Sequence, residues 1–591
     1  MLSPLILLHW VLGFGRWNFF YLDTAREMIM PRRILAGELP FRDFEVFYGP
    51  LPYHVTAFFL KLFGNHLWVD RALNVLLLAA TVWLLCRVAG ELGMSRRWRL
   101  VLGGSYLVLF AFPADGFILF SFLWPHCQAG VYQPMLQLLL AWLVVMICKR
   151  QRTRHVLGLC LVCGTMPLFS RLDSALGIAF FGLIGLAFPW ILFQKRSALF
   201  CCAISLAGLA AMVLPGTLWF LVTSAPMPQG LLIERLLEIR YFLSPTSDLF
   251  VWKAFFRSAC FGLLLLGATI LLAKLHRRPV LWLCLASVSA LTIWIVTCEM
   301  GTLGTQYYFM ILVFDYAATA IYLFCLGSCP DKSFFLIRAI LGLGGCLFAA
   351  RVFASAYSFY AFIYAGMLAL LIVLVALKEF FSVCLAEREF RRVGWTLGFC
   401  WCSGLLLLSW RVLAGYGACD YRVDTEWGPI WMRHSPQARH WKEVAKVVNS
   451  QTRADERLYS YCPNAVIYVL SSRLPAEYDV DGTRWKSRVI DGVLCSFAED
   501  RTISLIEKHR VQWIIQDNET FFAPYIRSTR LLYEKGQIKN LCLAFGRDEA
   551  PKLARWINEH FEKYRCWGMP LEPGSPRYSI EILKKRPLPQ Q

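Results

Sequence analysis

The chain of 591 residues is 57% hydrophobic and 17% charged, with a mean hydropathy of +0.50. These values indicate a polytopic membrane protein with a water-exposed portion. The net charge of +20 does not indicate a nucleic-acid partner, because residues 415–591 hold 27 Lys and Arg against 22 Asp and Glu, out of 60 against 40 in the chain. The excess lies mostly in the apolar part, where basic loops set topology.

Apolar runs near the ~20 residues needed to cross ~30 Å of hydrocarbon continue to about Ala414, and charged and turn residues become frequent after it. We therefore predict a transmembrane domain over 1–414 and a soluble α/β domain over 415–591. The first run is interpreted as an anchored helix, because no A-x-A cleavage pattern follows it. Thirteen spans are predicted, centred roughly on 3–20, 66–89, 100–120, 130–148, 156–170, 174–193, 198–222, 255–273, 280–298, 307–328, 337–353, 358–377 and 394–414.

The loops after the even-numbered spans all carry Lys or Arg, whereas loop 111–128 has neither and loop 299–306 has only Glu299 as a charged residue. This bias places the N-terminus and the basic loops in the cytoplasm. An odd number of spans then places residues 415–591 outside. The six basic loops are 95–99, 149–155, 194–196, 274–278, 330–338 and 378–392.

In the first predicted outer loop, 21–65, Asp23 lies at the exit of span one. The sequence that follows it, TAREMIMPRRILAG (24–37), has apolar residues at helical spacing and Gly37 as a stop. We predict a helix lying on the membrane surface, with Arg32 and Arg33 toward lipid headgroups or a phosphate. Asp23 and Arg26, three residues apart, would share one face at its start.

The second half of this loop supplies Asp43 and Glu45, followed by the turn Tyr48-Gly49-Pro50 and an amphipathic stretch. Separated carboxylates at a membrane interface suit an enzyme whose acceptor hydroxyl needs a general base and whose lipid-linked phosphate donor needs cations. The alternative is that these charges solvate a loop and cap helices.

The segments DTAREM, ILAGELPFRDFE and YGPLPY, with the acidic loop after span one and a C-terminal outer domain, resemble the GT-C glycosyltransferases. The resemblance covers nearly the whole chain and is strongest to the protein O-mannosyltransferase and aminoarabinose-transferase branch. It implies about thirteen spans followed by an outer α/β domain. It also implies inverting transfer of one sugar from a polyprenyl-phosphate carrier to a lipid, glycan or protein acceptor, at the outer face of a bacterial cytoplasmic membrane.

Residue by residue, the resemblance implies that Asp23 binds or deprotonates the acceptor hydroxyl, that Glu45 is the second acidic residue and that Arg26 lies near the donor phosphate. In the aminoarabinose branch the glutamate is followed by a lysine and two prolines. Here Val46 and Phe47 follow, so the phosphate-binding lysine of that branch is missing.

Further candidates lie elsewhere in the chain. Arg171 and Asp173 interrupt an apolar hairpin, where the alternatives are a donor contact or an ion pair that stabilises a re-entrant turn. Tyr307 and Tyr308 open span ten, where they resemble a tyrosine-containing loop near the lipid phosphate or serve as an interfacial belt. Arg240 lies in the amphipathic loop 224–253 and suits a phosphate. Asp43, Tyr48 and Asp173 are predicted to bind the acceptor or support the site.

In the outer domain, residues 457–463 are predicted as a strand leading to a short helix, and residues 504–510 as a helix leading to a strand at 511–517. The segment 531–547 is predicted as a terminal hairpin. No Gly-rich phosphate loop and no H-E-x-x-H or G-x-S-x-G motif occurs here. We expect this domain to recognise the acceptor or to cover the catalytic groove.

No obligatory cofactor is expected, although Asp23, Asp43 and Glu45 could offer hard oxygen ligands to a divalent cation. Two other functions remain open: a transporter or flippase for a lipid-linked glycan, and a ligase that uses a pyrophosphate-linked glycan. The chain shows no internal repeat, and its notable charges cluster at the predicted outer face rather than at mid-membrane, which favours the enzyme over the transporter.

Overall fold

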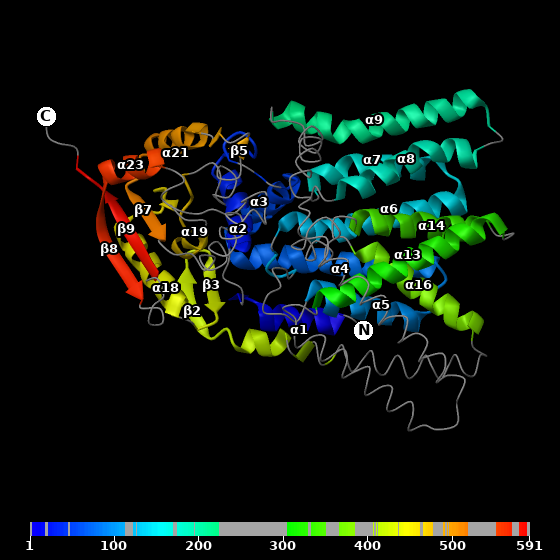
Figure 1. Ribbon diagram of the computed structural model, residues 1–591, viewed down its shortest axis with the longest axis horizontal. Helices are drawn as coiled ribbons and strands as arrows, with labels where there is room; N and C mark the ends of the chain where they lie inside the picture. Colours follow the sequence, from blue (N-terminus) through cyan, green and yellow to red (C-terminus); the bar gives the residue numbers. More distant parts are fainter. Residues whose placement is uncertain are drawn as a thin grey trace, which may run out of the picture. The chain divides into compact units, whose positions relative to one another are not determined.

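The computed structural model forms two compact units, each described here by itself (Figure 1). One comprises Met1–Phe14 and Ala72–Gly415, and the other comprises Gly15–Arg71 and Tyr416–Gln591. The structure describes residues 3–17, 22–44, 46, 48–112, 122–125, 127–169, 174–193, 196–223, 304–328, 332–349, 366–384, 406, 409–410, 412–434, 436–460, 465–476, 489–490, 493–494, 496–517, 551–569 and 578–587.

The first unit is built from packed helices. They are α1 (Ser3–Gly13), α4 (Leu67–Glu91, from Ala72 onward), α5 (Arg96–Tyr106) with the π-helical turn η1 (Leu107–Ala111), α6 (Gln128–Arg150), α7 (Thr153–Phe169), α8 (Ala175–Leu192), α9 (Ala198–Thr223), α13 (Gly304–Ser328), α14 (Lys332–Ala349) and α16 (Met367–Cys384). Neighbours in the chain pack together, with α7 between α6 and α9 and with α14 against α13 and α16.

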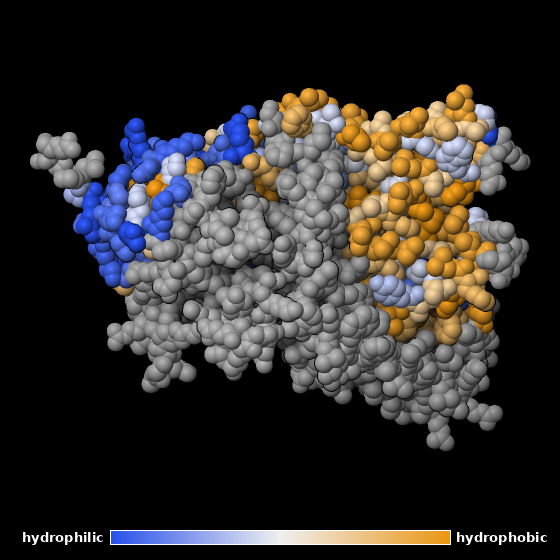
Figure 2. Space-filling view, turned by 45° about the horizontal axis from the view of Figure 1, so that its top comes forward, coloured by the Kyte–Doolittle hydropathy of each residue, from blue (hydrophilic) through white to orange (hydrophobic). Residues whose placement is uncertain are grey.

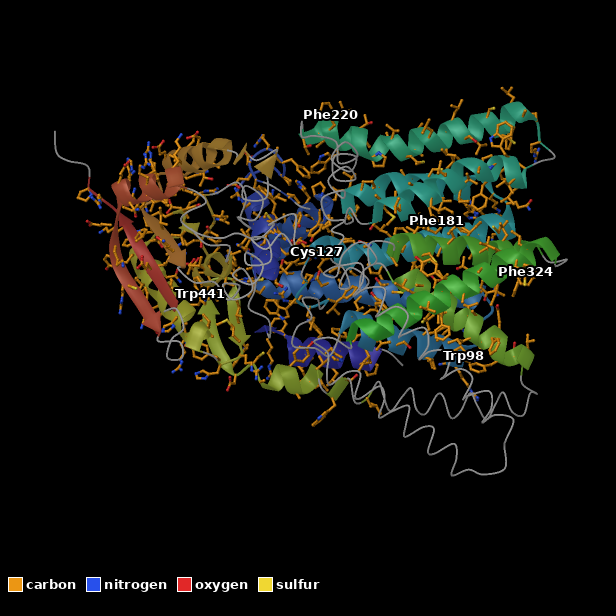
Figure 3. All side chains as sticks on the ribbon, viewed as in Figure 1. Trp98, Cys127, Phe181, Phe220, Phe324 and Trp441 are labelled. Carbon is orange, nitrogen blue, oxygen red and sulfur yellow. The ribbon has the colours of Figure 1, made fainter. Side chains whose placement is uncertain are left out.

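The surface of these helices is strongly apolar, as Figure 2 shows in orange. Leu183, Leu199 and Phe324 are 67%, 81% and 79% exposed, whereas Phe181 is fully buried and stacks on Phe348 (Figure 3). Among the described helices, α4, α6, α8 and α9 are long and apolar enough to cross a membrane. Side chains of this kind on an outer surface suit lipid rather than water, so the chain is a multi-pass membrane protein.

Each predicted span that the structure describes overlaps a helix, and the bounds differ at several ends. The helices α5 and α14 begin at Arg96 and Lys332, inside the predicted loops 95–99 and 330–338. The span predicted over 3–20 is helical only to Gly13, because Gly15 adopts a φ of +69° and its carbonyl accepts a hydrogen bond from the Trp431 N–H at 2.6 Å. The span predicted over 358–377 is helical over Met367–Cys384, so its helix extends into the predicted loop. The spans 255–273 and 280–298 and most of 394–414 lie outside the described residues, and the count of thirteen stays a prediction.

Polar contacts join several helix ends at one end of this unit. Lys149 donates to the Glu91 carboxylate at 2.9 Å, and Lys378 donates to the Gly93 carbonyl at 3.2 Å. Arg338 of α14 donates to the Leu92 carbonyl at 3.2 Å and also pairs with Glu379 of α16. Four of the loops predicted to be cytoplasmic therefore begin or end at the same end of the bundle. Which side of the membrane this end faces stays a prediction.

The second unit contains a small sheet that joins distant segments of the chain. Strand β1 (Arg16–Trp17) pairs in parallel with β3 (Gly428–Met432), which pairs antiparallel with β2 (Tyr421–Thr425). The segment that follows α1 is thus tied to residues more than 400 positions later. Helices α2 (Leu22–Leu35) and α3 (Leu51–Phe63) pack on each other, and α2 also packs on α19 (Val466–Ser471).

A four-stranded sheet forms the rest of this unit, in the order β4 (Tyr459–Ser460), β7 (Trp513–Asp517), β9 (Tyr578–Lys585) and β8 (Phe561–Met569). Helices α18 (Pro436–Gln451), α21 (Ser496–Lys508) and α23 (Pro551–His560) accompany it, and β5 (Val489–Ile490) pairs with β6 (Val493–Leu494). Leu553 and Ile557 of α23 pack with Ile514 of β7 in its core. The β4–α19 and α21–β7 successions agree with the predicted elements. The predicted hairpin at 531–547 lies outside the described residues.

Candidate functional site

Helix α2 carries two of the predicted site residues, and most of its described length is buried. It begins at Leu22, so Asp23 lies in its first turn, and it ends at Leu35 before Gly37, whose φ of +87° favours glycine. The prediction of a helix with a glycine stop is therefore confirmed. The expectation that Arg32 and Arg33 face lipid headgroups is wrong, because the two side chains are only 2% and 1% exposed.

Arg32 is held from three directions. Its guanidinium donates to Asp70 Oδ2 at 3.1 Å and to the Met28 carbonyl at 2.6 Å, and it stacks over the Trp427 ring at 4.2 Å. Burial lowers the pKa of Arg32, and the carboxylate of Asp70 opposes this shift. A buried guanidinium requires such a partner, because desolvation penalises its charge. Residues from α4 and from the segment before β3 therefore fix the second half of α2.

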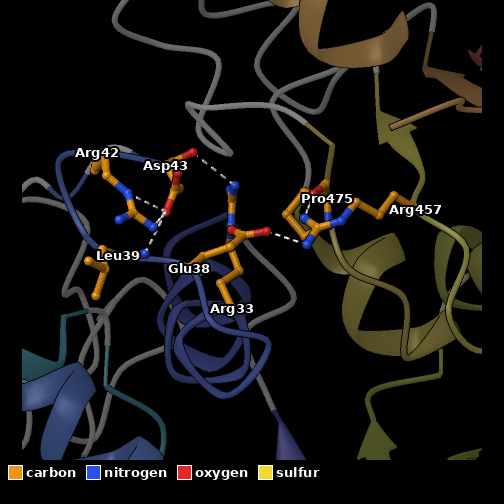
Figure 4. Close-up of polar contacts among 7 residues, drawn as sticks. All are labelled: Arg33, Glu38, Leu39, Arg42, Asp43, Arg457 and Pro475. Carbon is orange, nitrogen blue, oxygen red and sulfur yellow. Dashed lines mark hydrogen bonds and ion pairs between the residues drawn. The ribbon is translucent and has the colours of Figure 1, made fainter. Parts of the chain in front are cut away.

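Arg33 takes part in a second buried cluster, which Figure 4 shows. Its Nε donates to one oxygen of Glu38, and Arg457 pairs with the other oxygen. Arg33 also donates to the Asp43 carbonyl at 3.3 Å, and Arg457 donates to the Pro475 carbonyl at 2.8 Å. Glu38 is thus a carboxylate bridge between α2 and the segment that leads into β4.

Asp43, a predicted supporting residue, organises its own loop. One oxygen accepts the Leu39 N–H at 2.9 Å and two guanidinium contacts from Arg42, at 3.0 and 2.6 Å. Burial acts to raise the pKa of Asp43, but Arg42, the Leu39 N–H and nearby Lys508 together hold it below the usual value. The carboxylate is therefore ionised at neutral pH.

Arg26 and Tyr48, both predicted for the site, lie close together in the structure. The guanidinium carbon of Arg26 lies 5.8 Å from the centre of the Tyr48 ring, and its nitrogens contact Glu27 Oε1 at 3.2 and 3.1 Å. Tyr53 of α3 donates its hydroxyl to Glu27 Oε2 at 2.9 Å. The Arg26 guanidinium is thus held by the Glu27 carboxylate and lies near the Tyr48 ring, and Tyr53 in turn binds that carboxylate.

For Asp23, Tyr307 and Tyr308 the structure describes the backbone alone. Tyr307 and Tyr308 lie near the start of α13. Glu45, Arg171, Asp173 and Arg240 lie outside the described residues. Within the described ranges, no three His, Cys, Asp or Glu side chains lie close enough to share a metal ion.

The sequence reasoning missed Glu27, Glu38, Asp70 and Arg457, which hold the predicted residues in place. Their charge was visible, but nothing in the local pattern distinguishes a buried partner from a solvated one. It also missed Asp315, a fully buried carboxylate in the apolar helix α13. Such a residue normally suggests a transport or proton path. Here the surroundings are tight, because a Cβ added at Gly345 would lie 2.8 Å from Asp315 Oδ2.

No family model and no curated protein matches the chain. Among solved structures, it is similar to ArnT from Cupriavidus metallidurans bound to undecaprenyl phosphate, with 12% identity, a TM-score of 0.46 and coverage of 98% of this chain and 97% of that chain. It is also similar to the Archaeoglobus fulgidus oligosaccharyltransferase in complex with Zn and sulfate, with 10% identity, a TM-score of 0.45 and coverage of 98% and 72%. Similarity at this level assigns no substrate to the chain.

Proposed function

We propose that the protein is an integral-membrane glycosyltransferase that moves one sugar from a polyprenyl-phosphate carrier to an acceptor at the outer face of a bacterial cytoplasmic membrane. The acceptor is a lipid, a glycan or a protein. In this proposal residues 1–414 hold the carrier within the membrane, and the α/β elements after residue 415 lie on the periplasmic side.

The observation that carries the proposal is the anchoring of α2 by buried ion pairs. A loop whose charges merely meet solvent does not bury two arginines to 2% and 1% exposure. Burial at this cost is typical of segments that hold a site in a fixed geometry. Asp23 and Arg26 lie three positions apart in the first half of this anchored helix.

The proposed reaction uses Asp23 as the base that takes or orients the proton of the acceptor hydroxyl while that oxygen attacks the anomeric carbon with inversion. Arg26 stabilises the departing lipid phosphate, because a guanidinium binds phosphate oxygens through paired N–H donors. Glu45 orients the acceptor or supports Asp23. Arg171, Arg240, Tyr307 and Tyr308 are proposed as further donor-phosphate contacts, and Asp43, Tyr48 and Asp173 as acceptor or supporting residues.

The proposal includes no obligatory cofactor. If a divalent cation takes part, Asp23, Asp43 and Glu45 supply its oxygen ligands. Transfer that survives a strong chelator would exclude this role for a cation, and transfer that is lost and then restored by Mg²⁺, Mn²⁺ or Zn²⁺ would establish it.

The test is transfer by the purified full chain in lipid nanodiscs, with a panel of polyprenyl-monophosphate sugars and membrane extract as the source of acceptor. Asp23→Asn should abolish transfer and retain carrier binding. The matched control is Asp424→Asn, because the Asp424 side chain is 70% exposed on β2. Carrier binding without transfer, equal in the wild type and Asp23→Asn, would contradict the proposal and favour a transporter. Transfer only from pyrophosphate carriers would favour a ligase.

A further inference from the structure

Helix α6 carries two buried amides, one turn apart, that the proposed reaction does not use. Gln133 is 1% exposed and Gln137 is fully buried. Residues four positions apart lie on the same face of a helix, so these side chains are neighbours. Pro134 lies between them and has no N–H to donate to the Gly130 carbonyl. The Gly130 carbonyl oxygen therefore lacks its usual helical donor and is a backbone acceptor in the same turn.

Three polar atoms of this pair make no hydrogen bond in the part of the chain that the structure describes: Gln133 Oε1, Gln137 Oε1 and Gln137 Nε2. A buried amide left without partners lowers stability, and native proteins satisfy nearly all such groups with protein, water or ligand. In contrast, Gln128 at the start of α6 donates to Asn74 Oδ1 at 2.6 Å. The structure therefore satisfies one amide of this helix and leaves two for another partner.

The amide groups of Gln133 and Gln137 indicate which kind of partner they bind. Residues 128–148 of α6 contain no charged side chain, so nothing in this helix favours a phosphate or an ammonium group. An amide offers an N–H₂ donor and a carbonyl acceptor, which match a hydroxyl group that both donates and accepts. Neutral hydroxyl groups come from two sources: the ring of a sugar, or water.

The position along α6 favours the sugar. The Lys149–Glu91 contact marks the far end of the helix, which is the end predicted to be cytoplasmic. At a rise of 1.5 Å per residue, Gln133 and Gln137 lie about 8 and about 14 Å from Gln128, in the half of α6 nearest the predicted outer face. The other half, residues 138–148, is entirely apolar.

We infer that Gln133 and Gln137 form a subsite for the hydroxyl groups of the sugar on the lipid-linked donor. This inference rests on the proposed function and deepens it, because it separates recognition of the sugar from recognition of the phosphate. In this proposal the α6 amides bind the hydroxyl groups of the neutral sugar ring and make no contact with the charged phosphate.

The test compares binding of bare undecaprenyl phosphate with binding of undecaprenyl phosphates that carry a neutral hexose, an N-acetylhexosamine or an aminopentose, all to the full chain in nanodiscs. The wild type should bind at least one glycosylated carrier more tightly than the bare carrier. Gln137→Leu and Gln133→Leu should weaken that binding about tenfold, or about 1.4 kcal/mol, and leave the affinity for the bare carrier unchanged. The control is Gln451→Leu, at an exposed glutamine that ends α18.

Equal affinity of the wild type and Gln137→Leu for every carrier, together with a higher Tm of the variant, would show that the amides meet only water and would overturn the inference. A wild type that shows no preference for any glycosylated carrier would overturn it too. Tight, amide-dependent binding without transfer would contradict the proposed function alone. Transfer with the same KM in the wild type and in both amide variants would overturn the subsite alone.

Discussion

The ion pair between Arg32 and Asp70 and the ion pair between Arg42 and Asp43 have the same chemistry in opposite surroundings. The first spans 3.1 Å, with side chains 2% and 6% exposed. The second spans only 2.6 Å, with side chains 58% and 28% exposed. Distance alone would rank the second pair as stronger. Burial reverses the order, because removal of one buried partner leaves a desolvated charge, whereas an exposed partner is replaced by water.

The largest effect is therefore expected from Asp70→Asn. This variant removes the carboxylate that balances the buried Arg32 guanidinium, and the expected loss is about 3–5 kcal/mol of folding free energy. The measurement is the free energy of unfolding in detergent, from chemical denaturation monitored by far-UV circular dichroism. The double variant Arg32→Met with Asp70→Leu removes both charges and should be less destabilised than Asp70→Asn. The opposite order would contradict the role of the pair.

The partners of these arginines show where sequence reasoning stopped. A helix over the segment 24–37, stopped at Gly37, was predicted from local spacing, and the observed helix α2 spans Leu22–Leu35. Whether Arg32 points to lipid or to the protein interior depends on Asp70, 38 positions later, and on Trp427, which lies in another segment. Local periodicity holds no information about such distant partners.

In the fold, too, elements determined by local sequence were predicted, and elements that depend on distant partners were missed. Long apolar runs are a local property, so helices α4, α6, α7, α8 and α9 were predicted within a few residues of their observed bounds. Strand β1 has two residues, which is too short for any periodic pattern, and its partner β3 is far away in the chain. The β8–β9 pair was missed as well, because its strands are rich in charged residues and were not distinguished from loops.

A smaller effect is expected from Tyr53→Phe, which tests the orientation of Arg26. The variant removes a hydrogen bond from the Tyr53 hydroxyl to the buried Glu27 carboxylate at 2.9 Å. Hydrogen bonds to charged groups contribute about 1.5–3 kcal/mol, so Tm should fall by several degrees. Tyr421→Phe, on the half-buried strand β2, is the control and should leave Tm unchanged. Equal Tm values for Tyr53→Phe and the wild type would show that Glu27 does not depend on this hydroxyl.

The pH dependence of stability should show a weaker effect, through His509. Burial and then the nearby charge of Arg457 lower its pKa to about 4, with further lowering by Lys508 and Arg33 and an opposing contribution from Glu38. The folded state therefore favours neutral His509. Its contribution is complete above the unfolded pKa of about 6.5 and is lost as pH falls toward 4.

The measurement is Tm between pH 7 and pH 4 for the wild type and His509→Gln. Other groups titrate over the same range in both proteins, so only the difference between the two curves reports His509. The wild type should lose more Tm than the variant as the pH falls. Parallel curves would show that His509 titrates as freely in the folded chain as in the unfolded one.

The smallest effect is expected from Arg42→Gln, which completes the comparison of buried and exposed pairs. Solvent replaces the lost contact to Asp43, and the Asp43 carboxylate keeps its hydrogen bond from the Leu39 N–H at 2.9 Å. The Tm of this variant should equal that of the wild type at 0.15 M salt, where exposed charges are screened. Asp43→Asn should lower Tm more, because it weakens the acceptor for that N–H as well as the pair. If Arg42→Gln instead lowered Tm as much as Tyr53→Phe, the contact distance rather than burial would determine the stability of these ion pairs.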